Sequence, residues 1–504
     1  MEELPLNLRG LRYKSFSLVY MHSFGVATKG LDKVVINNPH IKLFDNLVDS
    51  QIFEIDPQLG SPVKRYILPD FDFSTVLEEP YEVTIQGKIY VALDLFLGQT
   101  AMLSFKMVVN NDACTASESI TTDHLIALAA LNLGAEHWNV GEERTCSNIN
   151  LTTSPVDIKN LRVTADGIFT EQGYDLSENK EWSNSFDVVC GLYKKAVLNM
   201  LDTVAYPSKN FVYVDIWEDV DNYDGSLQAM EKEEDIIKYI SDNCKKELVG
   251  LMSLYPSEWP YRTEEAFDDV CGFNIAIDTD DLVLVNSSMC VVFGTYARRG
   301  KDSPTDWAEM MKDRSVQHVS WFEYLLILQM ILAKKYALSI AKRYVIKESN
   351  YNNSNVNITR AQMQRNTQLE MEITNLLMNL DAVDYSKFIS HKIMFDRTTK
   401  RLDIDKDLSD LQNILKRTEN ALKNVSTLQE LEQSQNMNII LFVVSVASLA
   451  QIIMSEPKVP LLEKFNLGWL AGGLGHTIVS LTILLAIVAI GYLIYNFIKD
   501  LKNK

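Results

Sequence analysis

A basic cluster, Arg298-Arg299-Gly300-Lys301, follows a predicted strand in a chain that is otherwise acidic. Guanidinium and ammonium groups bind phosphate oxygens through charge-assisted hydrogen bonds, and the intervening glycine lets the backbone approach such a ligand. Strand ends are also where α/β sheets commonly bind ligands. We therefore expect Arg298, Arg299 and Lys301 to bind a small phosphate-bearing molecule. The alternative is a solvated basic loop.

A second combination of aromatic and basic residues comprises His137-Trp138 and Arg144, in a polar stretch that is rich in predicted loop. An aromatic ring can stack on a planar ligand while an arginine binds its negative charge. Trp138 and Arg144 are therefore further candidates for ligand binding. The pattern is no more specific than the basic cluster, and a solvated loop explains it equally well.

A partial calcium-loop pattern occurs at Asn222, Asp224, Gly225 and Glu231, which match the third, fifth, sixth and twelfth positions of such a loop. The first position is Val220, which has no side-chain oxygen to offer a cation. A turn between a strand and a helix, with acidic residues near the helix N-terminus, explains the same residues. A divalent cation remains a possible ligand of the chain, and its metal-binding residues are unknown.

Motifs of soluble enzymes are absent from the sequence. It contains no GxSxG, no GxxxxGK[ST] and no HExxH, and its seven histidines are scattered. The six cysteines contain no CxxC pair, which favours free thiols over a zinc site or a disulfide framework. We expect a protein that is not an enzyme and has no certain cofactor. A membrane-anchored enzyme with an unrecognised site is the alternative.

Two apolar runs lie near the C-terminus, and they predict membrane spans at about 437–456 and 476–498. A bilayer core needs roughly 20 apolar helical residues, so the first run is marginal and the second is sufficient. A buried core helix is the alternative for the first. Basic residues flank the pair on both sides: Lys416, Arg417, Lys423, Lys499, Lys502 and Lys504. The loop between the two runs carries only Lys458 and Lys464, balanced by Glu456 and Glu463. The excess of basic residues outside the pair predicts a hairpin with both termini in the cytoplasm.

Polar side chains in the first predicted span share one side of a helical wheel. They fall within an arc of roughly 140° at 3.6 residues per turn. These residues are Asn438, Ser445, Ser448, Gln451 and Ser455. In an oligomer the arc would line a central pore, because polar groups at this depth face protein or water. Hydrogen bonding between helices without conduction is the alternative.

The elements that position these residues predict an α+β protein, in which a cytosolic α/β domain is followed by a helical stalk and a C-terminal transmembrane hairpin. The proposed boundaries are 1–316 for a ligand-sensing domain, 317–436 for the stalk and 437–498 for the hairpin. Apolar residues from Ile404 to Val425 keep a spacing of four and three, which predicts one long helix continuing into the first span. Nothing like a signal peptide opens the chain.

Several elements within the first two regions have their own patterns. We expect strands at 15–20, 88–97, 101–109, 211–217, 273–277, 282–285 and 290–296. We expect helices at 123–133, 226–254 and 321–338, the last of them buried in protein because it carries four polar or charged residues. The formal net charge of −19 argues against nucleic acid as a direct partner and is compatible with cations or a small ligand.

The long helix, the short external loop, the second span and the basic tail resemble the CorA-type superfamily of divalent-cation channels, over about 320–504. The resemblance implies a homo-oligomer, by family a pentamer, in the inner (plasma) membrane and in contact with lipid. The family's Gly-Met-Asn signature is missing: Ile453-Met454-Ser455-Glu456 stands at its place, and Asn436-Met437-Asn438 lies at the cytoplasmic end.

The enlarged N-terminal region and the missing signature are similar to the CorA-like effectors of type III CRISPR systems. That resemblance implies an antiviral channel activated by a nucleotide second messenger of the S-adenosylmethionine–AMP type. A magnesium transporter is the alternative within the superfamily.

Overall fold

We analysed a computed structural model of the chain, which describes part of its length. The described residues are 8, 10–26, 42–44, 63–77, 79–96, 100–109, 114–131, 190–191, 193–194, 197–198, 201, 209–227, 230, 232–254, 259–294, 323–353, 371 and 389–455. The chain divides into two compact units. One comprises 1–347 and 368–414, and the other comprises 348–367 and 415–504.

A 10-stranded mixed sheet forms the centre of the first unit, with its main path in the order β2-β3-β4-β5-β1-β8-β10-β9. Its strands are β1 (Leu11–Gly25), β2 (Lys42–Phe44), β3 (Val63–Leu77), β4 (Val83–Phe96), β5 (Thr100–Val109), β6 (Cys114–Ala116), β7 (Ile120–Thr121), β8 (Lys209–Asn222), β9 (Asp281–Val285) and β10 (Met289–Gly294). Only β8 and β10 pair in parallel among these strands. The mixed α/β content predicted from sequence is confirmed.

The strands expected at 88–97 and 101–109 are confirmed as β4 and β5. They pair antiparallel, since Phe96 lies opposite Thr100 and the register continues to Ile89 and Met107. Strand β1 lies between β5 and β8 and is antiparallel to both. Because β1 is buried along most of its length, the sheet is covered on both faces along this central strand.

One face of the sheet carries an apolar core that is covered by helices α1 (Thr122–Ala130), α5 (Glu233–Asn243) and α6 (Lys245–Ser253). Helix α1 begins where the sequence predicted, because the Thr121 hydroxyl accepts a hydrogen bond from the backbone N–H of His124. On the same face, the Tyr20 hydroxyl donates to the carbonyl of Leu128, which joins β1 to α1. Burial of this face supplies the main driving force for folding the unit.

Helix α10 (Glu323–Asn353) packs on the other face of the sheet. Its segment Tyr324–Arg343 is apolar and long enough to cross a membrane, the one such segment among the residues whose side chains the structure describes. However, 83% of that segment is buried within the protein. The prediction of a buried helix here is therefore confirmed, and α10 extends further than its apolar pattern indicated.

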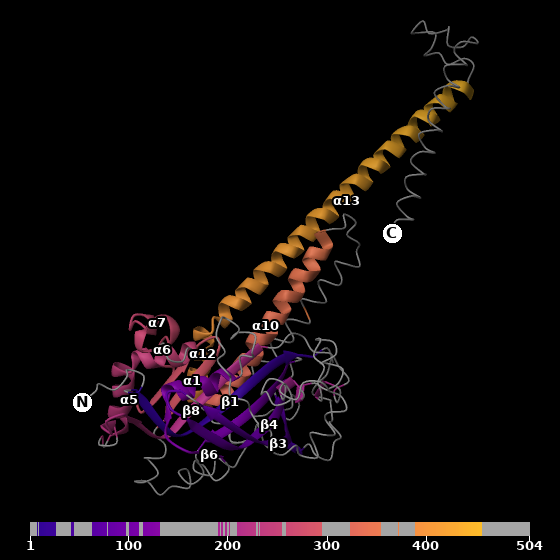
Figure 1. The fold of residues 1–504 in the computed structure, drawn as a ribbon. Helices are drawn as coiled ribbons and strands as arrows, with labels where there is room; N and C mark the ends of the chain where they lie inside the picture. Colours follow the sequence, from indigo (N-terminus) through magenta and orange to yellow (C-terminus); the bar gives the residue numbers. More distant parts are fainter. Residues whose placement is uncertain are drawn as a thin grey trace. The chain divides into compact units, whose positions relative to one another are not determined.

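Helix α12 (Ile389–Arg401) leads into α13 (Ile404–Ser455), a single helix of 52 residues (Figure 1). The base of α13 packs on the first unit through Ile404 and Leu411, which are 0% and 1% exposed. The prediction of one helix from the stalk into the first apolar run is confirmed, and α13 ends at Ser455. The second predicted span lies outside the described residues, so a two-helix hairpin stays a prediction.

Two predicted elements differ in the structure. The prediction of a strand at 273–277 is wrong. The Asn274 side chain accepts a hydrogen bond from the backbone N–H of Val283 and donates one to the carbonyl of Asp281. These side-chain bonds to β9 replace some of the backbone bonds that a strand would make. The helix predicted at 226–254 is two helices, α5 and α6, separated at Cys244, whose ψ of 22° departs from helical geometry. Both regions carry apolar periodicity, but local polar side chains and backbone geometry determine their ends.

Candidate functional site: the polar layer between the sheet and the long helices

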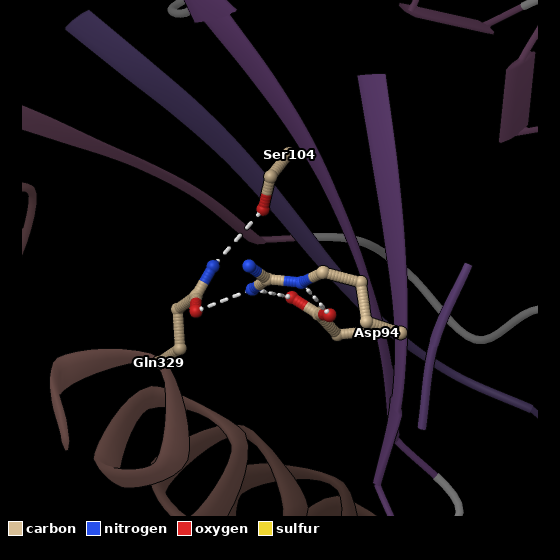
Figure 2. A network of polar contacts seen from close by, with 4 residues as sticks. Asp94, Ser104 and Gln329 are labelled. Atoms are coloured by element: carbon tan, nitrogen blue, oxygen red, sulfur yellow. Dashed lines mark hydrogen bonds and ion pairs between the residues drawn. The ribbon is translucent and has the colours of Figure 1, made fainter. Parts of the chain in front are cut away.

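A buried polar network joins the sheet to helix α10 (Figure 2). Arg65 on β3 donates from Nε and Nη2 to the two carboxylate oxygens of Asp94 on β4, at 2.6 and 2.7 Å. The same Nη2 donates to Gln329 Oε1 at 2.9 Å, and Gln329 Nε2 donates to the Ser104 hydroxyl on β5 at 3.2 Å. The Arg65, Asp94 and Gln329 side chains are 3%, 0% and 1% exposed. Each member is satisfied by another, so burial of the charges is compensated.

The pairing register of the sheet explains why these residues meet. Arg65 lies directly opposite Asp94, and Ser104 lies opposite Ala92, two residues away on the same face. Side chains alternate between the faces of a strand, so all three point toward α10 while their neighbours enter the apolar core. The network thus fixes the position of α10 on three adjacent strands. A one-residue slip of either β3 or β4 would separate the charges.

Two further hydrogen bonds tie α10 to its surroundings. Near the start of α10, the Tyr324 hydroxyl donates to Asp281 Oδ2 on β9 at 2.9 Å. One turn and more beyond Gln329, Lys335 Nζ donates to the backbone carbonyl of Leu402 at 2.6 Å, where α12 gives way to α13. Helix α10 therefore contacts both the sheet and the base of the longest helix, which makes it a physical link between them.

Helix α12 provides a second link through two arginines one turn apart. Arg397 donates to the carbonyls of Ile275 and Ala276, in the irregular segment before β9. Arg401 donates to the carbonyls of Asp269, Val270 and Val285. All of these acceptors are neutral backbone oxygens, and no carboxylate of the described residues lies within ion-pair distance of either guanidinium. The arginines hold the segment 269–285 against α12.

A buried carboxyl lies on the opposite, apolar face. Glu247 on α6 accepts hydrogen bonds at Oε1 from the backbone N–H of Leu11 and from the hydroxyl of Thr122, at 2.8 and 2.7 Å. Burial raises the pKa of Glu247, and these hydrogen bonds oppose that rise. Because a Cβ at Gly10 would lie 2.2 Å from that oxygen, the glycine is required for the contact. Glu247 therefore joins β1, α1 and α6 and serves the fold.

His124, in the first turn of α1, is held in its neutral form by burial. Its Nδ1 accepts from the backbone N–H of Thr121 at 3.2 Å, and its Nε2 lies 2.7 Å from the carbonyl of Tyr81, to which it donates. Burial lowers the pKa of His124 from 6.5 to about 4, with the Tyr81 carbonyl opposing the change. The imidazole completes the helix cap from a position where a carboxylate or amide is usual.

The cysteines of the described residues are buried free thiols, as predicted. Burial raises the pKa of Cys114 and of Cys271 to about 12. Thiols with a raised pKa are poor nucleophiles, since the thiolate is the reactive form. These cysteines have packing roles. Cys146 lies outside the described residues.

The predicted ligand-binding residues lie outside the described residues. This holds for Arg298, Arg299, Lys301, Trp138 and Arg144. Their role in binding phosphate therefore stays a prediction.

The predicted pore-lining residues all belong to α13. Asn438 and Ser445 have exposed side chains, and the side chains of Ser448, Gln451 and Ser455 lie outside the described part. The Ser445 hydroxyl donates to the carbonyl of Leu441 at 2.7 Å. Such a bond satisfies a serine within its own helix, so Ser445 can face either water or lipid.

The partial calcium-loop pattern forms a turn after β8. Asn222 uses its amide within that turn, accepting from the backbone N–H of Ser226 at 2.8 Å and donating to the Ser226 hydroxyl at 2.6 Å. Asp224 accepts from the same N–H, and Gly225 adopts a φ of 75°. The strand-to-helix turn, which was the alternative, is confirmed. No group of three metal-ligating side chains occurs among the described residues.

The sequence did not indicate the roles of Arg65 and Asp94. Both strands carry other charged residues, and a solvent-facing position explains a charged residue in such a strand equally well. Gln329 was visible as a polar residue within an apolar helix, but its partners are distant in sequence. A charged residue at a position that alternation assigns to a covered face is the signal that could have identified the pair.

Comparison with known proteins identifies no relative. No protein family, no curated protein and no solved structure matches this chain.

Proposed function

We propose that the chain is the subunit of a homo-oligomeric, CorA-like membrane channel that is gated by a small phosphate-bearing ligand on its cytosolic sheet domain. The observation that carries the proposal is α13, which begins packed on the sheet unit and continues without interruption into the first apolar run. A continuous helix of this kind can transmit a displacement at its base to a pore. The proposed setting is antiviral defence by a type III CRISPR system, with a nucleotide second messenger as the activator.

The exposed apolar surface of α13 supports a membrane location. The Met437, Leu441 and Phe442 side chains are 61%, 58% and 69% exposed, and Ile439 and Ile440 are also exposed. The four consecutive residues 439–442 point to different sides of the helix, because successive residues are about 100° apart. A helix that is apolar on every side requires either a protein interior or a membrane. The described neighbours do not supply an interior here, and a bilayer together with other copies of α13 would cover this surface.

The polar arc supports a pore over a simple membrane anchor. Ser448 and Gln451 belong to that arc, while Val443 lies on the opposite side of the helical wheel. Rotational symmetry would repeat each polar group around a central axis. Neutral hydroxyl and amide groups in the lining favour weak ion selectivity. Ser445, which is satisfied by its own helix, is the member of the arc whose loss is expected to matter least.

Ligand-dependent ion flux in liposomes tests this proposal. We expect flux through the wild type when a nucleotide-derived activator is added. Ser448→Leu should abolish it, since a ring of apolar side chains closes a pore by dewetting. Val443→Leu is the matched control, because it adds bulk to a side that already faces lipid or neighbouring helices. Equal loss of flux in the two variants, with membrane insertion intact, would refute the pore assignment.

A further inference from the structure

The base of the long helix is attached to the sheet unit through Arg401, the last residue of α12. Its Nε donates to Val285 at the end of β9, at 2.8 Å, and its Nη2 donates to Val270 and Asp269 at the end of α7 (Ala266–Val270), at 3.0 and 3.3 Å. The last carbonyls of a helix have no partner within it, so the guanidinium satisfies acceptors that α7 itself leaves open. One side chain thus joins a strand end, a helix end and the start of α13.

Gly272 leaves the space that Arg401 occupies. A Cβ at Gly272 would lie 2.5 Å from both Nε and Cζ of Arg401, closer than such atoms approach. The residue also has a φ of 72°, which glycine adopts at little cost. Gly225 offers a natural comparison, because its φ is 75° and the nearest atom to a Cβ there is 3.8 Å away. The two glycines differ in whether a side chain would displace an arginine.

The chain changes direction immediately after Arg401. Asp403 has a φ of 55°, a left-handed conformation that is uncommon for a residue other than glycine. It separates α12 from α13, and its carbonyl accepts from the backbone N–H of Asp407 in the first turn of α13. Lys335 of α10 holds the adjacent carbonyl of Leu402. The joint between the helices is therefore fixed from two sides, by Arg401 and by Lys335.

We propose that Arg401, seated over Gly272, is the positioning residue that fixes the base of α13 to the sheet unit, and that movement of the sheet unit reaches the long helix through this joint. The bonds at the joint are made by cationic side chains to neutral carbonyls. Such bonds can be exchanged for water during a movement more readily than a packed apolar contact. The first half of this proposal concerns the fold alone, and the second half rests on the proposed channel.

Hydrogen exchange on the full-length protein in detergent, with no ligand present, tests the attachment. Gly272→Ala and Gly225→Ala both place alanine at a positive φ, so both carry the same backbone penalty. We expect Gly272→Ala to speed exchange of the amides of residues 407–414 by about tenfold or more, since loss of the Arg401 bonds frees the first turns of α13. Gly225→Ala should leave these amides within about twofold of the wild type. Equal protection at 407–414 in both variants would overturn the attachment.

A double-mutant cycle establishes whether the effect acts through Arg401. In an Arg401→Ala background, Gly272→Ala should add little to the exchange of residues 407–414, because the clash has been removed. A full additional effect in that background would show that Gly272 acts through its own backbone, which contradicts the proposal. This cycle requires no channel activity.

Liposome flux tests the transmission step. Gly272→Ala should change the ligand concentration for half-maximal flux by about tenfold, while Gly225→Ala should leave it unchanged. An unchanged ligand response in Gly272→Ala, alongside the expected exchange result, would overturn transmission through the joint. A wild type that conducts no ions under any activator would refute the proposed channel, and with it the transmission step, while the exchange result on the attachment stands.

Discussion

Replacing Arg65 by methionine is expected to destabilise the sheet by about 3–5 kcal/mol, the usual cost of removing one partner of a buried ion pair. The substitution removes both bonds to the carboxylate of Asp94, whose side chain is 0% exposed. Met replaces the aliphatic stem of Arg with an apolar chain of the same length, so the packing of that stem is largely kept. What remains is a buried charge without a cation. A loss of this size is a large fraction of the stability of a domain, which is about 5–15 kcal/mol.

The double variant Arg65→Met/Asp94→Leu separates the charge effect from the packing effect. Removing both charges leaves an apolar pair at the same register position, and such replacements are often neutral. We expect the double variant to recover most of the stability lost in Arg65→Met. Gln329 then loses its Arg65 partner but keeps its bond to Ser104. The position of α10 should therefore be less strictly defined in the double variant even though the sheet is stable.

A second ion pair on the same two strands provides the control. Lys88 on β4 lies 3.4 Å from Asp70 on β3, and these side chains are 40% and 38% exposed. Exposed pairs contribute about 0–1 kcal/mol because water screens them. Lys88→Met should therefore have a small effect on the stability of β3 and β4. Both pairs join a cation to a carboxylate across the same two strands, and they differ most in burial, so burial is the main source of the contrast between Arg65→Met and Lys88→Met.

Hydrogen exchange of the amides of residues 64–68 and 91–95 measures the opening free energy of β3 and β4 directly, which avoids treating a chain of two units as a single transition. A loss below about 1 kcal/mol in Arg65→Met would refute the reasoning, because it would mean that the pair is exposed to water. A double variant as unstable as the single one would show that packing, and not charge, dominates.

Three further predictions concern ionisable groups. The pKa of His124 falls to about 4 in the folded protein, so the unfolded state takes up a proton at a higher pH than the folded state does. About 3 kcal/mol of stability should therefore be lost as the pH falls from 6.5 to 4. His124→Gln can keep the cap and should abolish this pH dependence, which urea titrations at several pH values would measure. Glu247 acts in the opposite sense, since its raised pKa means that stability falls as the pH rises above about 4.5, and Glu247→Gln should remove that decline in the same titrations. The half-exposed pair of Lys342 and Asp410, 3.1 Å apart, should contribute less than about 1 kcal/mol to stability. Lys342→Ala should lower the melting temperature less in 0.5 M salt than in dilute buffer, because salt screens the pair. An equal fall in melting temperature at both salt concentrations would contradict an ion pair.

Local patterns in the sequence predicted the elements whose ends depend on neighbours in the chain. The strands expected at 88–97 and 101–109 are β4 and β5, the helix expected at 123–133 is α1, and a spacing of four and three predicted α13. The same local reasoning was wrong at 273–277, where Asn274 bonds to the next strand through its side chain. Apolar patterning indicates which residues are covered, but it does not specify whether a backbone or a side chain completes a ladder.

The sequence alone determined that 324–343 and 437–454 are apolar, and the polar and charged residues of 321–338 favoured a buried helix there, but the sequence did not show what lies against either segment. Composition depends on single residues, whereas burial depends on what the rest of the chain brings alongside. The tertiary structure decided that α10 lies against the sheet and that the apolar part of α13 is exposed on every described side. It likewise decided that Arg65, Asp94 and Gln329, separated by up to 264 positions, share one buried network. Contacts over such separations follow from strand register and helix packing, and no local pattern records them.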